Sequence, residues 1–119
     1  MKGETYFDVT VPMVDLAFTV LFLKRERLKK YLEKHHKGWL DEMPNREIFG
    51  QCFFTKDNYV YMWMQRKPKT AHEHGTLGHE IQHLVIETMR RLNTPLCSET
   101  EEMYCKMTGE ITRQIYAKL

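Results

Sequence analysis

The sequence predicts an α+β fold, in which a small antiparallel or mixed sheet of about four strands carries helices packed against it. Its strand-like and helix-like segments follow in the order β-β-α-β-β-α-α, which is typical of this class. The 119 residues are 42% hydrophobic, which suffices for one modest core. Because no repeat, low-complexity segment or linker divides the chain, residues 1–119 are expected to form a single domain.

Two strands are expected at the start of the chain. Residues 6–14 alternate apolar and polar side chains and are rich in β-branched residues, with Pro12 placing that end at an edge or a bend. Residues 16–23 form a compact apolar run between polar residues, as a buried strand does. Since the turn between them is short, one long, bent strand is an alternative interpretation.

A charged helix is expected next, over residues 24–37. Leu28, Tyr31 and Leu32 give it a narrow apolar stripe, and a glycine follows it. His35 and His36 lie in its last turn, where contact with the negative end of the helix dipole explains them better than a metal does. A loop over residues 39–46 separates this helix from the following strands.

A hairpin is expected from residues 48–55 and 59–65, joined by three polar residues. Tyr59, Tyr61 and Trp63 share one face of its second strand, and three apolar residues share the other. An aromatic stripe on a strand usually packs into a core, and contact with a ligand or partner is the alternative. Residues 66–73 are expected to form a basic loop.

The helix that follows, within residues 75–93, contains the HExxH sequence His79-Glu80-Ile81-Gln82-His83. Residues four apart lie above one another on a helix, so both imidazoles can reach one metal ion and Glu80 can reach a water beside it. Ile86 lies on the same side as the histidines, which suggests that this side is partly covered. The opposite, apolar side should pack on the sheet; it comprises Leu77, Ile81, Leu84, Val85 and Leu92.

A last helix is expected over residues 99–116, after a break at Pro95. Ser98 suits the N-cap, with Glu101 completing a capping box. The apolar stripe of this helix is Tyr104, Met107, Ile111 and Ile115. Its first turn is acidic, which compensates the helix dipole, but one of these carboxylates is also a candidate third zinc ligand.

Composition narrows the class of protein. The net charge of +2 comes from 18 basic and 16 acidic residues that are interleaved, so no basic surface for nucleic acid is expected. Three cysteines without a CxxC pair argue against a disulfide framework and against a cysteine-rich zinc site. The N-terminus has no apolar signal segment and no run is long enough to span a membrane, so a cytoplasmic protein is expected.

The residues from Leu77 to Val85, from Ser98 to Glu102 and from Tyr104 to Ile115 together resemble a group of small phage and prophage proteins that look like minimal zincin metallopeptidases of the gluzincin type. The resemblance implies a small sheet with an active-site helix against it and a glutamate-bearing helix behind. It implies that His79 and His83 bind Zn²⁺, that Glu80 is the general base, and that Glu102 is the third ligand.

The choice of Glu102 rests on the resemblance, because Cys105 and Gly109 then occupy the places where the group has small residues facing the zinc-binding helix, and a glycine there lets two helices approach closely. The helical wheel favours Glu101 instead, because Glu101 lies nearer the apolar stripe, so Glu101 remains the alternative. Lys106 departs from the tyrosine expected in the group.

The function that follows from the motif and the resemblance is a zinc-dependent hydrolase, a metallopeptidase acting on a peptide or protein through a water activated by zinc. Tyr104, His72 and His74 are candidate donors to the oxyanion, although a flexible polar loop is the favoured explanation of both histidines. The alternative from another class is a phage accessory protein that binds zinc but acts through a protein partner, with the aromatic hairpin face as its contact surface.

Overall fold

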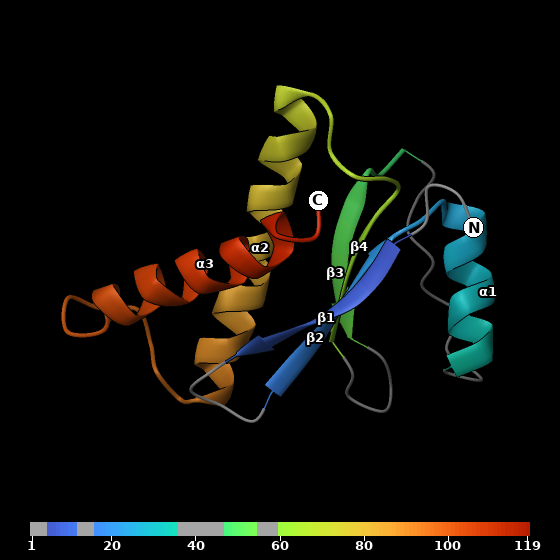
Figure 1. Ribbon diagram of the computed structural model, residues 1–119. Helices are drawn as coiled ribbons and strands as arrows, with labels where there is room; N and C mark the ends of the chain where they lie inside the picture. Colours follow the sequence, from blue (N-terminus) through green and yellow to red (C-terminus); the bar gives the residue numbers. More distant parts are fainter. Residues whose placement is uncertain (1–4, 12–15, 36–46, 55–59) are drawn as a thin grey trace.

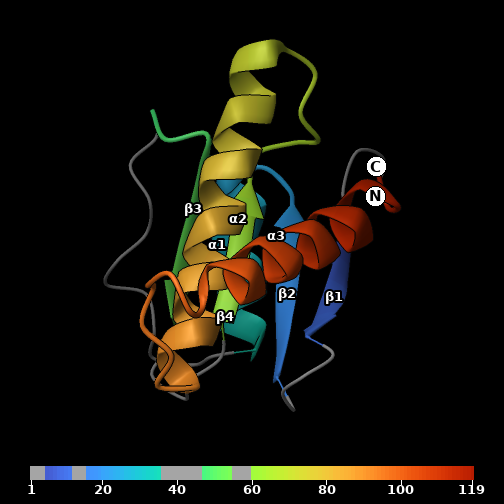
Figure 2. The same cartoon turned by 90° about the vertical axis from the view of Figure 1, so that its left-hand side faces the viewer.

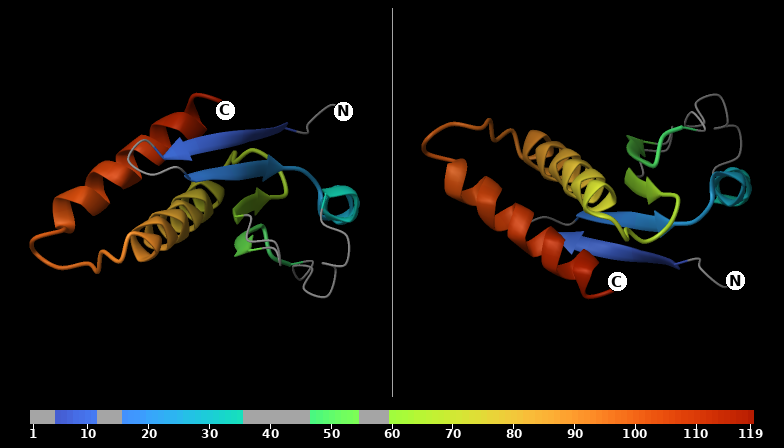
Figure 3. Two further views of the ribbon diagram at one scale, coloured as in Figure 1. Left: turned by 90° about the horizontal axis from the view of Figure 1, so that it is seen from below. Right: turned by 90° about the horizontal axis from the view of Figure 1, so that it is seen from above.

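The computed structural model describes residues 5–11, 16–35, 47–54 and 60–119. A four-stranded mixed sheet has two helices on one face and one helix on the other, as Figures 1 and 3 show. This confirms the α+β class and the sheet of four strands. The elements are β1 (Thr5–Val11), β2 (Leu16–Phe22), α1 (Arg25–His35), β3 (Gly50–Phe54), β4 (Val60–Met64), α2 (Ala71–Arg91) and α3 (Glu101–Tyr116).

The strand order in the sheet is β1-β2-β4-β3, so β1 and β3 are the two edges. β1 and β2 pair antiparallel, which shows that the first two apolar runs are separate strands and not one bent strand. β3 and β4 form the predicted antiparallel pair, and the parallel pairing of β2 with β4 joins the two halves of the sheet. The sheet is therefore mixed, with the outer pairs antiparallel.

The two faces of the sheet bury different side chains. Val60, Met62 and Met64 pack with α2 and α3 in the larger core, whereas Tyr61 and Trp63 pack with α1 in the smaller one. The predicted alternation along β4 is thus confirmed. Tyr61 and Trp63 are only 3% and 0% exposed, so they offer no surface to a partner, and Tyr59 lies outside the described residues. The aromatic stripe therefore belongs to the core.

The first helix buries the expected stripe. Leu28 and Leu32 are fully buried in α1, and Tyr31 is half-buried. His35 is exposed and its ring lies 4.3 Å from that of Tyr31, while His36 and the expected loop over residues 39–46 fall outside the described part of the chain. No helix among the described residues is long and apolar enough to cross a membrane.

The last helix crosses α2 on the larger core, as Figures 1 and 2 show. It begins at Glu101, two residues later than predicted, with Thr100 at the N-cap and no side-chain capping bond, so Ser98 is not the cap. The Thr100 hydroxyl instead accepts from the Cys97 N–H at 3.0 Å and donates to the Pro95 carbonyl at 2.6 Å. The predicted stripe is otherwise correct: Met107, Ile111 and Ile115 are buried and Tyr104 is half-buried.

The C-terminal half of α3 lies along the edge strand β1. The side-chain amide of Gln114 donates to the Thr10 carbonyl at 2.7 Å, and its oxygen accepts from the Thr10 N–H at 3.0 Å. One glutamine thus pairs with both outward-facing polar groups of an edge residue, much as a neighbouring strand would. This places α3 firmly over β1, while α2 lies over β3 and β4.

Candidate metal centre

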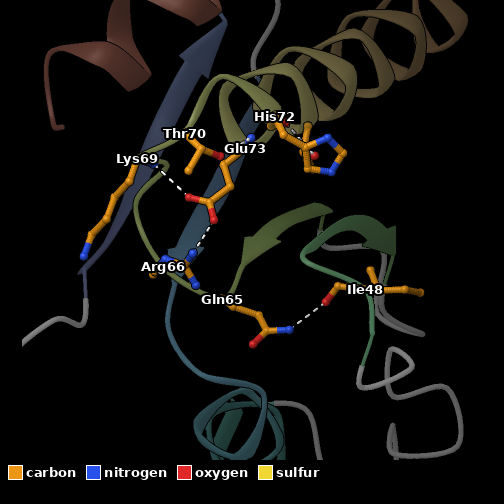
Figure 4. Close-up of polar contacts among 8 residues, drawn as sticks. Ile48, Gln65, Arg66, Lys69, Thr70, His72 and Glu73 are labelled. Atoms are coloured by element: carbon orange, nitrogen blue, oxygen red, sulfur yellow. Dashed lines mark hydrogen bonds and ion pairs between the residues drawn. The ribbon is translucent and has the colours of Figure 1, made fainter.

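The helix that carries HExxH begins at Ala71, one turn earlier than predicted, because its start is capped. The Thr70 hydroxyl accepts from the Glu73 N–H at 3.1 Å. The Glu73 carboxylate accepts from the Lys69 N–H at 2.9 Å and from the Arg66 guanidinium, and Figure 4 shows it lying between the two. The Lys69 N–H, followed by the nearby charges, holds the pKa of Glu73 below its usual range. This first turn fixes where α2 starts and hence how its faces lie on the sheet.

The body of α2 orients the motif as the helical period predicts. Leu77, Ile81, Leu84 and Val85 are buried against the sheet, and Leu92, just beyond the helix, is half-buried. His79 and His83 lie on the opposite, exposed side, and Ile86 beside them is 44% exposed. α3 therefore does not close over the histidines, contrary to what Ile86 suggested, and this side of the helix is open to solvent.

The two histidines already lie close enough to share one ion. Their Nε2 atoms are 3.2 Å apart, and the rings are 4.8 Å apart at 76°. Two nitrogens bound at the usual 2.0–2.1 Å to one tetrahedral zinc ion stand about 3.3–3.4 Å apart. The donors of His79, Glu80 and His83 lie within 4.8 Å of one another, and they form the one group of this kind among the described residues. This group could therefore hold a metal ion.

Glu80 lies beneath this pair and is held by the edge strand β3. Its Oε1 accepts from the Cys52 N–H at 2.8 Å, while its Oε2 lies 3.9 Å from the Nε2 of His79. The residue is only 6% exposed. One carboxylate oxygen is therefore occupied by the strand, and the other is left facing the histidines.

Cys52 also holds the main chain of Glu80, since its thiol donates to the Glu80 carbonyl at 3.2 Å. Burial, and after it the negative charge of Glu80, raises the pKa of this thiol far above its usual value. The neutral thiol is the form that donates this hydrogen bond to the Glu80 carbonyl. No sequence signal identifies this contact, because the partners are 28 residues apart and meet only through the sheet order.

The structure does not bring Glu102 to the histidines. Glu102 lines a hollow with Lys106 and Gly109, and all of the described residues that line it belong to α3. A Cβ at Gly109 would meet only the Arg113 side chain at 3.9 Å among the described residues, so Gly109 does not provide a close approach to α2. The reason for preferring Glu102 is therefore not supported, and its role as third ligand stays a prediction.

Glu101 lies on the side of α3 that faces α2. It lines a hollow with Gln82, Tyr104 and Thr108, and the Gln82 amide donates to the Thr108 hydroxyl at 3.2 Å. Gln82 itself stands between the two histidines in the sequence. Because Glu101 is exposed, its side chain can change rotamer without displacing packed atoms. The alternative considered from the sequence is thus a carboxylate that shares a hollow with Gln82 of the motif.

The remaining candidates have other partners. The Tyr104 hydroxyl donates to the Thr94 carbonyl at 2.7 Å, and Nδ1 of His74 lies 2.8 Å from the hydroxyl of Tyr116. His72 is exposed in the first turn of α2. His72 and His74 do not belong to the group of His79, Glu80 and His83, and the role of the three residues as oxyanion donors stays a prediction.

Comparison with known proteins identifies no relative of this chain. No family model, no curated protein and no solved structure matches it. The function must therefore be argued from the geometry of the site, and its most distinctive feature is the pair of imidazoles poised over a held carboxylate.

Proposed function

We propose that the protein is a zinc-dependent hydrolase, a metallopeptidase in which His79 and His83 bind the metal and Glu80 is the general base. The observation that carries the proposal is the 3.2 Å separation of the two Nε2 atoms above the free oxygen of Glu80. A surface helix with two unrelated histidines has no need of that arrangement. The resemblance of the motif to small zincins supports the same reaction class.

Zinc at this position would supply a water whose pKa is lowered to about 7. Glu80 accepts the proton of the attacking water at Oε2, since Oε1 is occupied by the Cys52 N–H. The edge strand thereby keeps the acceptor atom in place while the carboxylate changes charge. Because the histidine side of α2 is open, a peptide can reach this position from solvent without a lid.

Two histidines and an open position require one more protein ligand for a catalytic zinc site. In this proposal the third ligand is Glu101, because it lies on the side of α3 that adjoins Gln82. Glu102 remains the ligand that the family resemblance implies. Substitution of each carboxylate by its amide separates the two assignments.

The experiment that tests the function is the substitution Glu80→Gln. A glutamine can still accept from the Cys52 N–H but cannot take up the proton, so hydrolysis of a fluorogenic peptide library should be lost while zinc stays bound. Glu110→Gln is the matched control, because it changes a half-buried carboxylate of α3 that is bonded to Arg113 and lies outside the group of His79, Glu80 and His83. Full activity in Glu80→Gln would refute the assigned base.

A further inference from the structure

The exposed side of α2 is a stripe of side chains that runs along the whole helix. At 100° per residue its members lie within about 40° of His79. All of them are exposed, and they are His72, Gly75, His79, His83, Ile86 and Arg90. The side chain of His79 is 68% accessible to solvent, and Ile86 is 44% exposed. This set of residues, the α2 stripe, is therefore a surface that another molecule can reach.

The α2 stripe carries little charge that would oppose a second copy of the chain. The carboxylates of this helix, on Glu73, Glu80 and Glu87, are buried and lie off the stripe. Arg90 is the one stripe residue with a permanent charge, and its guanidinium bonds the Glu87 carboxylate at 2.7 Å. Two stripes can therefore come together without like charges meeting, provided that the two Arg90 side chains stay apart.

Each chain offers two imidazoles on this stripe, which is half of a closed zinc site. The Nε2 atoms of His79 and His83 are 3.2 Å apart. The group that could hold a metal ion adds only Glu80, whose Oε1 is already bonded by the Cys52 N–H at 2.8 Å. A closed zinc site takes four ligands, and imidazole nitrogen is among those that zinc prefers. Two chains related by a two-fold axis, the commonest symmetry of oligomers, supply four such nitrogens.

An antiparallel pairing of two α2 helices fits the side chains on either side of the histidines. From the level midway between His79 and His83, Ile86 lies about 7.5 Å toward one end of the helix and Gly75 about 9 Å toward the other. Antiparallel helices that meet at this level bring Ile86 of each copy against Gly75 of the other. Among the described residues nothing lies within 4 Å of a Cβ built on Gly75, so there is room for the isoleucine.

The antiparallel direction also separates the charges of the two stripes. Arg90 lies about 13.5 Å from the central level, so the two Arg90 residues stand about 27 Å apart along the helices. Parallel helices would instead place them side by side. Antiparallel helices further set the positive end of one helix dipole beside the negative end of the other. Charge and shape therefore favour the same arrangement.

We infer that two copies of the chain pair through their α2 stripes and share one zinc ion, bound by His79 and His83 of both copies. The consequence for catalysis rests on the proposed function. Four imidazoles leave no open position for a water, so Glu80 has no proton to accept and the dimer is the inactive form. When each chain has an ion of its own, the open position returns. The ratio of zinc to protein then sets the active fraction.

The test is sedimentation velocity on metal-free protein, purified without a His-tag, at increasing ratios of zinc to chain. The dimer should be absent without zinc, should be most abundant at one ion per two chains, and should decline once zinc exceeds one ion per chain. His79→Ala should remove the dimer at every ratio. His35→Ala is the matched control, because His35 is exposed on α1, outside the metal-binding group, and its loss should leave the dimer unchanged.

A second variant tests the pairing without touching a metal ligand. Ile86→Ala should leave the zinc affinity of the monomer unchanged, measured by competition with a chromophoric chelator at low protein concentration. It should weaken dimerisation at least about tenfold, because the two-fold axis removes the isoleucine contact twice. Leu96→Ala is the control, since it trims an aliphatic side chain that is 65% exposed beyond the end of α2 and should leave dimerisation unchanged.

A zinc-bound monomer at every ratio, a dimer that forms without zinc, or a dimer that persists in His79→Ala would overturn the inference. Wild-type dimerisation in Ile86→Ala would overturn the antiparallel pairing. Peptide hydrolysis by a zinc-bound protein that never dimerises would keep the proposed function and remove the shared site. A zinc-dependent dimer with no hydrolysis at any ratio would keep the shared site and remove the proposed function.

Discussion

Zinc should stabilise this protein through His79 and His83 by an amount that can be calculated. At a free zinc concentration 100 times the dissociation constant, binding to the folded state alone adds about 2.7 kcal/mol to the free energy of unfolding. The unfolding entropy is about 2.1 cal/mol/K per residue, or about 250 cal/mol/K for 119 residues. The midpoint of thermal unfolding should therefore rise by about 11 °C.

Replacing one histidine should remove most of that rise. Loss of a residue that only orients a metal ligand already lowers metal affinity 10- to 100-fold. Loss of an imidazole that binds the metal should therefore lower zinc affinity by at least about 100-fold. At the same zinc concentration about 0.4 kcal/mol would remain, which is a rise of about 2 °C. Since both imidazoles would bind the same ion, His79→Ala and His83→Ala should both lose most of the rise.

The assay is differential scanning fluorimetry on protein purified without a His-tag, after chelation and after addition of zinc. His72→Ala is the control of matched chemistry, because His72 is exposed on the same helix outside the cluster and should keep the full rise. A wild-type protein whose midpoint does not respond to zinc would refute the metal site. An equal rise in His79→Ala would show that zinc binds elsewhere.

Three further predictions follow. Isothermal titration calorimetry should show that Glu101→Gln weakens zinc binding at least tenfold, whereas Glu102→Gln does not. The reverse result would favour Glu102, the ligand that the family resemblance implies. Gly109→Ala should raise the free energy of unfolding in urea by up to about 1 kcal/mol, since the new Cβ meets only one side chain at 3.9 Å. Gly50→Ala should lower the free energy of unfolding, because its Cβ would lie 2.8 Å from a methionine side chain and 3.0 Å from a carbonyl of β4. Free energies of unfolding equal to that of the wild type would contradict the predictions for both glycines. Because folding lowers the pKa of Glu73, its carboxylate stabilises the folded protein. This stabilisation is complete above the unfolded-state pKa of about 4.3 and is lost as the pH falls through the folded-state pKa. In Glu73→Gln the free energy of unfolding should therefore fall less steeply as the pH is lowered.

The parts of the fold that depend on local periodicity could be predicted from the sequence. The alternation along β4 separated Met62 from Trp63, and the helical period of α2 separated Leu77 from His79. In both elements the backbone geometry fixes which side chains share a face. The apolar face is therefore buried whichever neighbouring element packs against it. The same reasoning identified His79, Glu80 and His83, which the structure brings together.

Boundaries and contacts between elements were harder to predict. The start of α2 was misplaced although Thr70 and Glu73 have the spacing of a capping box, because the histidines and lysines around them suggested a loop. The orientation of Gly109 depends on how α3 rotates over α2, and a helical wheel of one helix does not contain that angle. The contact of Cys52 with Glu80 depends on β3 taking the edge of the sheet, which local sequence does not specify.

Each edge strand of the sheet has one residue whose outward-facing backbone group is bonded by a side chain: Gln114 pairs with Thr10 on β1, and Glu80 accepts from the Cys52 N–H on β3. Unpaired edge groups invite strands of other molecules, so these two side chains also guard against aggregation. An alanine at position 80 would free the Cys52 N–H as well as remove the proton acceptor, and an insoluble inactive protein would say nothing about chemistry. Glutamine keeps the Cys52 N–H bonded, which makes it the informative substitution. The bond from Glu80 to the edge strand also favours solubility, and this role does not depend on hydrolysis.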